Sequence, residues 1–353
     1  MRNILIACLS ILLSATLWLP GKMTTAYAAD PPEWTRYPLI AHALGGIDGI
    51  DYTNSLQAFT QNYDKGQRVF EIDLSLTEDG KLAARHDWMG YLAQKFEQDI
   101  PENKLDEPLT LKEFKSYKIL EKYTPLSFND VVRILNKHPD VYFITDTKET
   151  DPKLVKQQFT LIRDTANKVD PAILDRVIPE IYSPEMMETV KEIVPFKNVI
   201  FSIYLSAMEP DEVVNFVKNN GIRVVAMPTE RVTDGFIAAL TKAGVVTYAH
   251  SINDTAEVKQ LMDLGVHGVY TDFLTYADLG INPTPLHSAA LADANADIKS
   301  QDSKLNASIL QPAVTAAVIT EPLANGQTIA QAPQKSAWET LKSLWTELIS
   351  TIL

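Results

Sequence analysis

Short apolar runs alternate with amphipathic helical segments along most of this chain, and that alternation limits the folds it can adopt. Eight runs of strand type begin near residues 39, 68, 141, 177, 198, 223, 245 and 267, with helical segments such as NSLQAFTQNYDKG between them. Strands that alternate with helices favour repeated βα units and a parallel sheet. Eight units over about 250 residues predict an α/β fold, a (β/α)8 TIM barrel. An open doubly wound sheet is the alternative, but no GxGxxG turn follows the first strand.

The barrel is expected to span residues 29–285, with an insertion after the second strand. Residues 88–124 show no clear periodicity, which predicts loop and short helix over one mouth of the barrel. Beyond the barrel, residues 286–335 are rich in Ala, Ser, Gln and Pro and almost free of aromatic residues. Such a composition is typical of a flexible linker.

The last residues, 336–353, have the pattern of an amphipathic helix. Their large apolar side chains recur at helical spacing, and they are Trp338, Leu341, Trp345, Leu348 and Ile352. We expect this helix to contact the barrel or a partner helix. Binding to a membrane surface is the alternative, which is weakened because the polar face carries a single cation, Lys342.

Residues 1–28 have the pattern of a secretory signal peptide, with Arg2, an apolar run and the small-residue sequence Ala-Tyr-Ala at 26–28. A membrane anchor is the alternative, but the apolar run is short for a span of about 20 residues. We therefore expect a secreted, extracytoplasmic protein. The single cysteine, Cys8, lies in the apolar run, so the mature protein can form no disulfide.

The balance of charge argues against a nucleic-acid partner. Loss of residues 1–28 would leave 30 Lys and Arg against 45 Asp and Glu, a formal charge of −15. An acidic enzyme that binds an anionic substrate must reverse the local field with a metal ion or with suitably placed Lys and Arg side chains.

The stretch VFEIDLSLTEDGKLAARHDW, residues 69–88, carries charges where a barrel strand would be apolar. Side chains alternate along a strand, so Glu71 and Asp73 share one face and point into the barrel or its mouth. If Asp79-Gly80 forms a two-residue turn, His86 lies directly across from Asp73. The hairpin is therefore expected to bring three ionisable groups together.

Further polar groups follow other predicted strands. Asp146 and Lys148 share a face at the end of FITDTK, and His42 follows the first strand. The carboxyl ends of barrel strands meet at one face, where such enzymes carry out their chemistry. His42 and His86 can act as general acid and base near neutral pH. Three carboxylates offer the hard oxygen ligands that suit a divalent cation, Mg²⁺ or Ca²⁺: Glu71, Asp73 and Asp146.

Two residues of other strands are candidates for substrate contact. Tyr182 lies on the fourth strand and His250 ends the seventh. A structural role is the alternative for both, because a lone histidine at a strand end usually has one. Asp272, before the last loop, is expected to cap a turn.

These motifs resemble the glycerophosphodiester phosphodiesterases, a family of the phosphatidylinositol-phospholipase-C-like barrel superfamily. The resemblance covers residues 39 to about 274 and rests on IAHALGG, on Asn54 in YTNSLQAF, on FEIDLSLTEDGKLAARHD, on ITDTK, and on SIND with LMDLGVHGVYTDF. The third of these motifs is specific, since its E-x-D pair, D-G turn and H-D pair all fall at the family's spacing.

The resemblance implies a role for each site residue. His42 and His86 would be the acid/base pair, Lys148 would contact the phosphate, and the divalent cation would be held by Glu71, Asp73 and Asp146. A hydroxyl of the substrate's own glycerol would attack phosphorus with help from one histidine, while the other protonates the leaving alcohol. Water would then open the cyclic phosphate.

The chain departs from the family at several positions. Ala43 stands where the family usually has Arg after the first His, which removes a phosphate clamp. The usual E-x-K is Asp146-Thr147-Lys148, and His250 takes the place of the usual Trp in the seventh strand.

Three functions follow from these observations. The first is a secreted, metal-dependent phosphodiesterase that cleaves glycerophosphodiesters to glycerol 3-phosphate and an alcohol. The second is a phospholipase C-like or lysophospholipase D-like enzyme on lipid substrates, favoured if residues 336–353 bind bilayers. The third is an inactive barrel that serves as a surface-binding module. Retention of both histidines and all three carboxylates argues against the third, because a decayed site has no physical reason to keep buried charges.

Overall fold

The computed structural model describes residues 30–281, and in this part of the chain eight parallel strands close into a barrel. The neighbours run in the order β1-β9-β8-β7-β6-β5-β4-β2, and pairing of β1 with β2 closes the ring. β3 is antiparallel to β2 and forms a hairpin with it. The bounds are β1 Leu39–Ala41, β2 Val69–Leu76, β3 Leu82–Ala84, β4 Tyr142–Asp146, β5 Val177–Ile181, β6 Ile200–Ser202, β7 Val224–Pro228, β8 Val246–His250 and β9 Gly268–Thr271. The predicted (β/α)8 barrel is confirmed, and each predicted strand start lies within about two residues of an observed one.

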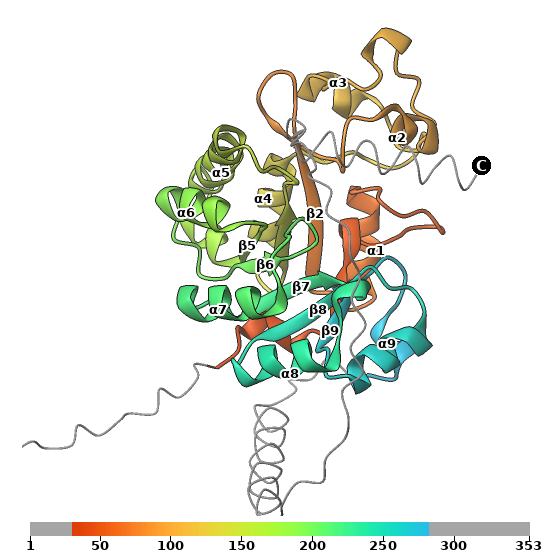
Figure 1. Cartoon of the computed structure of the whole chain (residues 1–353). Helices are drawn as coiled ribbons and strands as arrows, with labels where there is room; N and C mark the ends of the chain where they lie inside the picture. Colours follow the sequence, from red (N-terminus) through yellow and green to blue (C-terminus); the bar gives the residue numbers. More distant parts are fainter. Residues whose placement is uncertain (1–29, 282–353) are drawn as a thin grey trace, which may run out of the picture. The chain divides into compact units, whose positions relative to one another are not determined.

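Helices follow the barrel strands and lie around them (Figure 1). Those predicted between strands are all present, and the described helices are α1 Leu56–Asp64, α2 Gly90–Lys95, α3 Leu111–Ser116, α4 Phe128–Lys137, α5 Pro152–Asn167, α6 Pro184–Ile193, α7 Pro210–Asn220, α8 Asp234–Lys242, α9 Thr255–Asp263 and α10 Tyr276–Leu279. Several begin at a side chain that accepts a hydrogen bond from the first turn, as Ser55, Asp151 and Thr233 do. Within residues 30–281, no helix is long and apolar enough to cross a membrane.

The apolar face of β2 packs outward against helix α1, as the alternation of its side chains predicts. The Phe59 ring of α1 lies 4.9 Å from the Phe70 ring of β2 and 5.9 Å from the Phe143 ring of β4, measured between centroids. All three side chains are buried. This packing leaves the opposite face of β2, with its two carboxylates, for the interior of the barrel.

The register predicted for the β2–β3 hairpin is wrong by one residue. Leu74 pairs with Ala84, so Arg85 and not His86 follows directly across from Asp73. The loop has three residues, 78–80, because the Thr77 amide donates a hydrogen bond to the Lys81 carbonyl. Gly80 ends the loop in the left-handed conformation, with φ of 64°. His86 therefore lies beyond the paired part of the hairpin.

The predicted insertion contains two short helices, α2 and α3, which lie near the hairpin at the end of β2 (Figure 1). The Trp88 and Phe114 rings pack edge to face with centroids 5.7 Å apart, which fixes α3 against the strand end. The insertion thus packs at the carboxyl end of β2, where Trp88 also donates a hydrogen bond to the Leu76 carbonyl.

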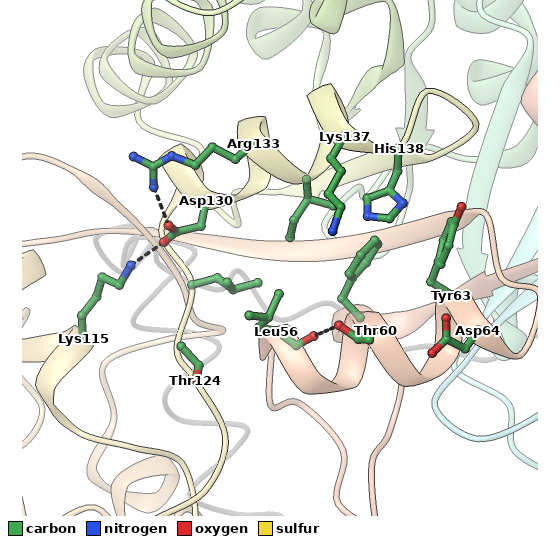
Figure 2. Close-up of a pocket in the computed structure, with 13 residues that line it drawn as sticks. Leu56, Thr60, Tyr63, Asp64, Lys115, Thr124, Asp130, Arg133, Lys137 and His138 are labelled. Atoms are coloured by element: carbon green, nitrogen blue, oxygen red, sulfur yellow. Dashed lines mark hydrogen bonds and ion pairs between the residues drawn. The ribbon is translucent and has the colours of Figure 1, made fainter.

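A groove of about 450 Å³ runs between α1 and α4 on the outer layer of the barrel (Figure 2). Lys115 and Arg133 pair with Asp130 at one end of it. The groove contains none of the site residues that the sequence predicts.

The predicted signal peptide (1–28) and C-terminal helix (336–353) lie outside the described residues, as does the linker (286–335). Those three assignments and the barrel limits at 29 and 285 stay predictions.

Candidate active site

The predicted site residues gather at the carboxyl ends of the barrel strands. Asp73 of β2 lies in register with Asp146, the last residue of β4. His42 directly follows β1, Lys148 lies two residues after β4, and His250 is the last residue of β8. Parallel strands bring these positions to one face because their carboxyl ends meet there.

Three carboxylates form a compact cluster at this face. Glu71, Asp73 and Asp146 each offer an oxygen, and these oxygens all lie within 4.8 Å of one another. Glu71 Oε2 accepts a hydrogen bond of 2.6 Å from the Ala43 amide. Glu71 Oε1 is buried and has no hydrogen-bond partner among residues 30–281. Burial, followed by the charges of Asp73 and Asp146, holds the pKa of Glu71 well above its ordinary value.

The cluster fits a divalent cation. A buried carboxylate oxygen without a donor is costly unless a cation satisfies it, and three oxygens at this separation can reach one ion. Glu71, Asp73 and Asp146 would hold it, as the sequence predicts.

Lys148 supplies the fixed positive charge of the cluster. Its Nζ lies 2.9 Å from Asp73 Oδ1 and also pairs with Asp146 Oδ2. Burial would lower the pKa of Lys148, but the charges of Asp146 and Asp73 outweigh it and raise the pKa well above the ordinary value. Burial would likewise raise the pKa of Asp73, but Lys148 and the two histidines hold it below its usual range.

Each predicted catalytic histidine has a carboxylate on its Nδ1 atom. His42 Nδ1 lies 2.9 Å from Asp272 Oδ1, and His86 Nδ1 lies 2.6 Å from Asp87 Oδ2. A carboxylate on Nδ1 keeps the proton on that nitrogen and leaves Nε2 for chemistry. Burial would lower the pKa of His42, but the hydrogen bond and charge of Asp272 raise it above its ordinary value.

The Tyr52 side chain joins the two histidines. Its ring contacts His42 and His86 edge to face, with centroid distances of 4.8 Å and 5.2 Å. Tyr52 and Asn54 adopt left-handed backbone conformations, with φ of 61° and 46°. Such conformations cost about 1–3 kcal/mol for a non-glycine residue, and they occur mostly where a site requires them.

Asn54 ties this loop to the carboxylate cluster. Its Nδ2 donates a 2.7 Å hydrogen bond to Asp73 Oδ2, and its Oδ1 accepts one from the Asp73 amide. The loop that carries Tyr52 is thus held in place by Asp73, a strand residue that belongs to the carboxylate cluster.

Tyr182 lies against the cluster. Its hydroxyl donates a 2.5 Å hydrogen bond to Asp146 Oδ1 and accepts one of 3.1 Å from the Thr147 amide. Tyr182 is buried, and its hydrogen bond orients the carboxylate of Asp146. Nearby, burial and the charge of Asp146 raise the pKa of Glu180 to about 8.

His250 lies between two tyrosine rings, Tyr204 and Tyr270, with centroid distances of 5.8 Å and 5.7 Å. Its Nε2 atom is buried and finds no hydrogen-bond partner among the described residues. Burial, followed by the charge of His42, lowers the pKa of His250 to about 4. A neutral imidazole can both donate and accept a hydrogen bond, and residues 30–281 leave the capacity of Nε2 unused.

Sequence reasoning missed three residues of this site. It assigned Asp272 to a turn cap, but the Asp272 carboxylate binds His42 and accepts a 2.7 Å hydrogen bond from Asn253. It gave no role to Tyr52 or Asp87. The position of Asp272 directly after the last barrel strand was the available signal, since strand ends carry the site.

The fold and this arrangement define a barrel enzyme that cleaves phosphoric diesters. Residues 41–275 match the model of the glycerophosphoryl diester phosphodiesterase family, and the chain belongs to that family.

Known proteins resemble the chain over the same region. A glycerophosphodiester phosphodiesterase of Bacillus subtilis (strain 168) is 22% identical over 233 residues, which cover 60% of this chain and 77% of that protein. A phosphodiesterase of Oleispira antarctica, solved with the product sn-glycerol-3-phosphate, superposes with a TM-score of 0.56 at 17% identity, covering 67% of this chain and 93% of the other. A glycerophosphodiester phosphodiesterase of Parabacteroides distasonis ATCC 8503 gives 0.53 at 15% identity, with coverage of 67% and 92%. The predicted family is thereby confirmed, and the chain is a phosphoric diester hydrolase.

Proposed function

We propose that this enzyme hydrolyses glycerophosphodiesters to glycerol 3-phosphate and an alcohol outside the cytoplasm. The observation that carries the proposal is the pairing of two carboxylate-bound histidines with an adjacent carboxylate triad. The family and the product bound to the Oleispira antarctica relative support the substrate class. The signal-peptide pattern of residues 1–28 supports secretion.

His42 and His86 form the acid/base pair of the proposed reaction. Both present Nε2 while a carboxylate holds Nδ1, so one can take the proton of the attacking glycerol hydroxyl and the other can protonate the leaving alcohol. Water then opens the resulting cyclic phosphate to give glycerol 3-phosphate. Tyr52 keeps the rings at a set separation by packing against both. Such preorganisation lets the two proton transfers occur without rearrangement of the site.

Glu71, Asp73 and Asp146 hold Mg²⁺ or Ca²⁺ in this proposal. Such a cation stabilises the negative charge that develops on the phosphoryl oxygens. Lys148 lies between two of the cluster carboxylates and would contact a phosphate oxygen. Tyr182 orients Asp146. His250, half-buried at the end of β8, would contact the substrate.

Product analysis tests the reaction. The protein is incubated with glycerophosphocholine, lysophosphatidylcholine or phosphatidylinositol in the presence of Mg²⁺, Ca²⁺ or EDTA. We expect glycerol 3-phosphate from glycerophosphocholine and loss of this turnover with EDTA or in His42→Ala. Turnover that survives EDTA would contradict the metal assignment, and cleavage of the lipids alone would favour the phospholipase-like alternative.

Metal binding has a separate readout in thermal unfolding. A cation that binds only the folded protein stabilises it by about 2.7 kcal/mol at a concentration of 100 times its Kd. We expect Mg²⁺ or Ca²⁺ to raise the Tm of the wild type and to leave the Tm of the Glu71→Gln variant unchanged. An equal rise in both proteins would argue against Glu71 as a ligand.

A further inference from the structure

The proposed site is strongly acidic around the position of an anionic substrate. Besides the three cluster carboxylates, Asp87 and Asp272 lie against the two histidines. Lys148 is engaged by two carboxylates, and Ala43 brings no charge to the position after His42. A phosphodiester carries a negative charge, so a second cation at the mouth would favour its binding.

Lys95, the last residue of α2, lies at this mouth. Its Nζ is 5.1 Å from the centroid of the Tyr52 ring, and that ring contacts both His42 and His86. Lys95 also forms an ion pair with Asp51, and its side chain is 33% exposed. The ammonium group is therefore separated from both histidines by one aromatic ring, on a side chain that is partly exposed.

The charge of Lys95 reaches the site. Burial would raise the pKa of Asp272, but the bond to His42, the bond from Asn253 and the charge of Lys95 together lower it. Lys95 belongs to the insertion, residues 88–124, and therefore adds a cation that the barrel strands do not provide.

We propose that Lys95 binds a non-bridging phosphate oxygen of the substrate and that the insertion thereby supplies the cation missing at Ala43. This inference rests on the proposed function, because the ligand is a phosphodiester monoanion. On binding, the ammonium group leaves Asp51 for the phosphate while its aliphatic stem stays on Tyr52. A lysine can make this movement because its ammonium group is carried on four flexible methylene groups.

Lys122 offers a matched control. Lys122 also lies in the insertion. Its Nζ lies 2.9 Å from Asp48, which is in the same loop as Asp51, and 4.6 Å from the centroid of the Tyr123 ring. Its side chain is 56% exposed. Replacement of Lys122 by methionine removes one positive charge, as the same replacement does at Lys95. Comparison of the two lysines separates a specific phosphate contact from a general effect of charge.

The test compares wild type, Lys95→Met, Lys95→Arg and Lys122→Met. Methionine keeps the packing on the tyrosine ring and removes the charge. Binding of inorganic phosphate and of sn-glycerol 3-phosphate is measured by calorimetry with Mg²⁺ present, and kcat and KM are measured on glycerophosphocholine. We expect Lys95→Met to raise both Kd values and the KM about tenfold with kcat within about twofold, and Lys95→Arg to restore binding within about threefold.

Two results would overturn the proposal. One is a phosphate Kd in Lys95→Met within about twofold of the wild type, and the other is an equal loss in Lys122→Met. Failure of the proposed function looks different: the wild type would cleave no glycerophosphodiester, while the phosphate titrations would still rank the four proteins.

Discussion

At the residue scale, the cluster carboxylates and the two histidines of the site could be predicted, but three residues that contact the histidines were missed. Glu71 and Asp73 stand out because charged residues interrupt an apolar strand, and such residues are rarely buried without a purpose. The bond between His42 and Asp272 joins positions 230 residues apart. The position of Asp272 after the last strand places it at the site face, but the pairing with His42 follows only from the closed barrel.

Asp272→Asn is expected to lower kcat by about 100-fold while leaving KM nearly unchanged. The asparagine keeps the shape of the side chain but removes the charge that favours the Nδ1–H tautomer of His42, and loss of such a partner typically costs about 10–100-fold or more. Steady-state kinetics on glycerophosphocholine measure the effect.

Asp278→Asn is the control for this change. Asp278 caps α10 six residues later in the chain and is exposed, so its charge serves only the helix. An Asp272→Asn enzyme as active as Asp278→Asn would show that the aspartate does not position His42.

At the element scale, hydrophobic periodicity predicted the strands and helices but not the turn that sets the hairpin register. Alternation along β2 correctly assigned the carboxylates to the inner face. The turn depended on a tertiary contact, since Asp79 Oδ1 accepts hydrogen bonds from the Thr77 hydroxyl and from the Leu111 amide 32 residues away. Two-residue and three-residue loops with Asp-Gly are both common, and the sequence of the hairpin alone does not distinguish them.

Gly80→Ala is expected to destabilise the protein by about 1–2 kcal/mol, because Gly80 has φ of 64° and an L-residue is strained there. The added methyl group would meet only the Gln157 side chain at 3.5 Å, so the cost is conformational and not steric. Urea unfolding monitored by circular dichroism measures the change.

Gly235→Ala is the opposite case. Gly235 lies inside α8, has no atom within 4 Å of an added methyl group, and lacks a positive φ. We expect stabilisation by about 0.5–1 kcal/mol from the better helix propensity of alanine. If both variants shifted in the same direction, the three-residue loop would not be the source of the Gly80 effect.

At the scale of the whole molecule, the alternating pattern was sufficient for the fold because eight βα units over this length have few other solutions. The family match covers residues 41–275, which falls inside the described barrel. Truncation tests whether residues 286–353 contribute to catalysis.

A protein of residues 29–285 is expected to retain the kcat and KM of a longer protein of residues 29–353 on glycerophosphocholine within about twofold. The reason is that every site contact described above lies between residues 42 and 272. Assays of both proteins on this soluble substrate test the expectation. A large loss in the shorter protein would show that residues 286–353 take part in the reaction.

Liposome flotation of the same two proteins tests the tail. Binding of the longer protein alone would favour membrane contact by residues 336–353 and the lipid-directed alternative. Equal recovery of both proteins in the soluble fraction would favour contact with protein.

The bond between His42 and Asp272 has a consequence for the order in which this enzyme becomes active. One partner follows the first barrel strand and the other follows the last, and these two strands are neighbours in the barrel. A nascent or prematurely terminated chain that ends between residues 146 and 272 contains both histidines and all three cluster carboxylates, yet it lacks the carboxylate that binds His42. If His42 acts as proposed, full activity requires the last barrel strand and the aspartate that follows it, so activity would report that the barrel has closed.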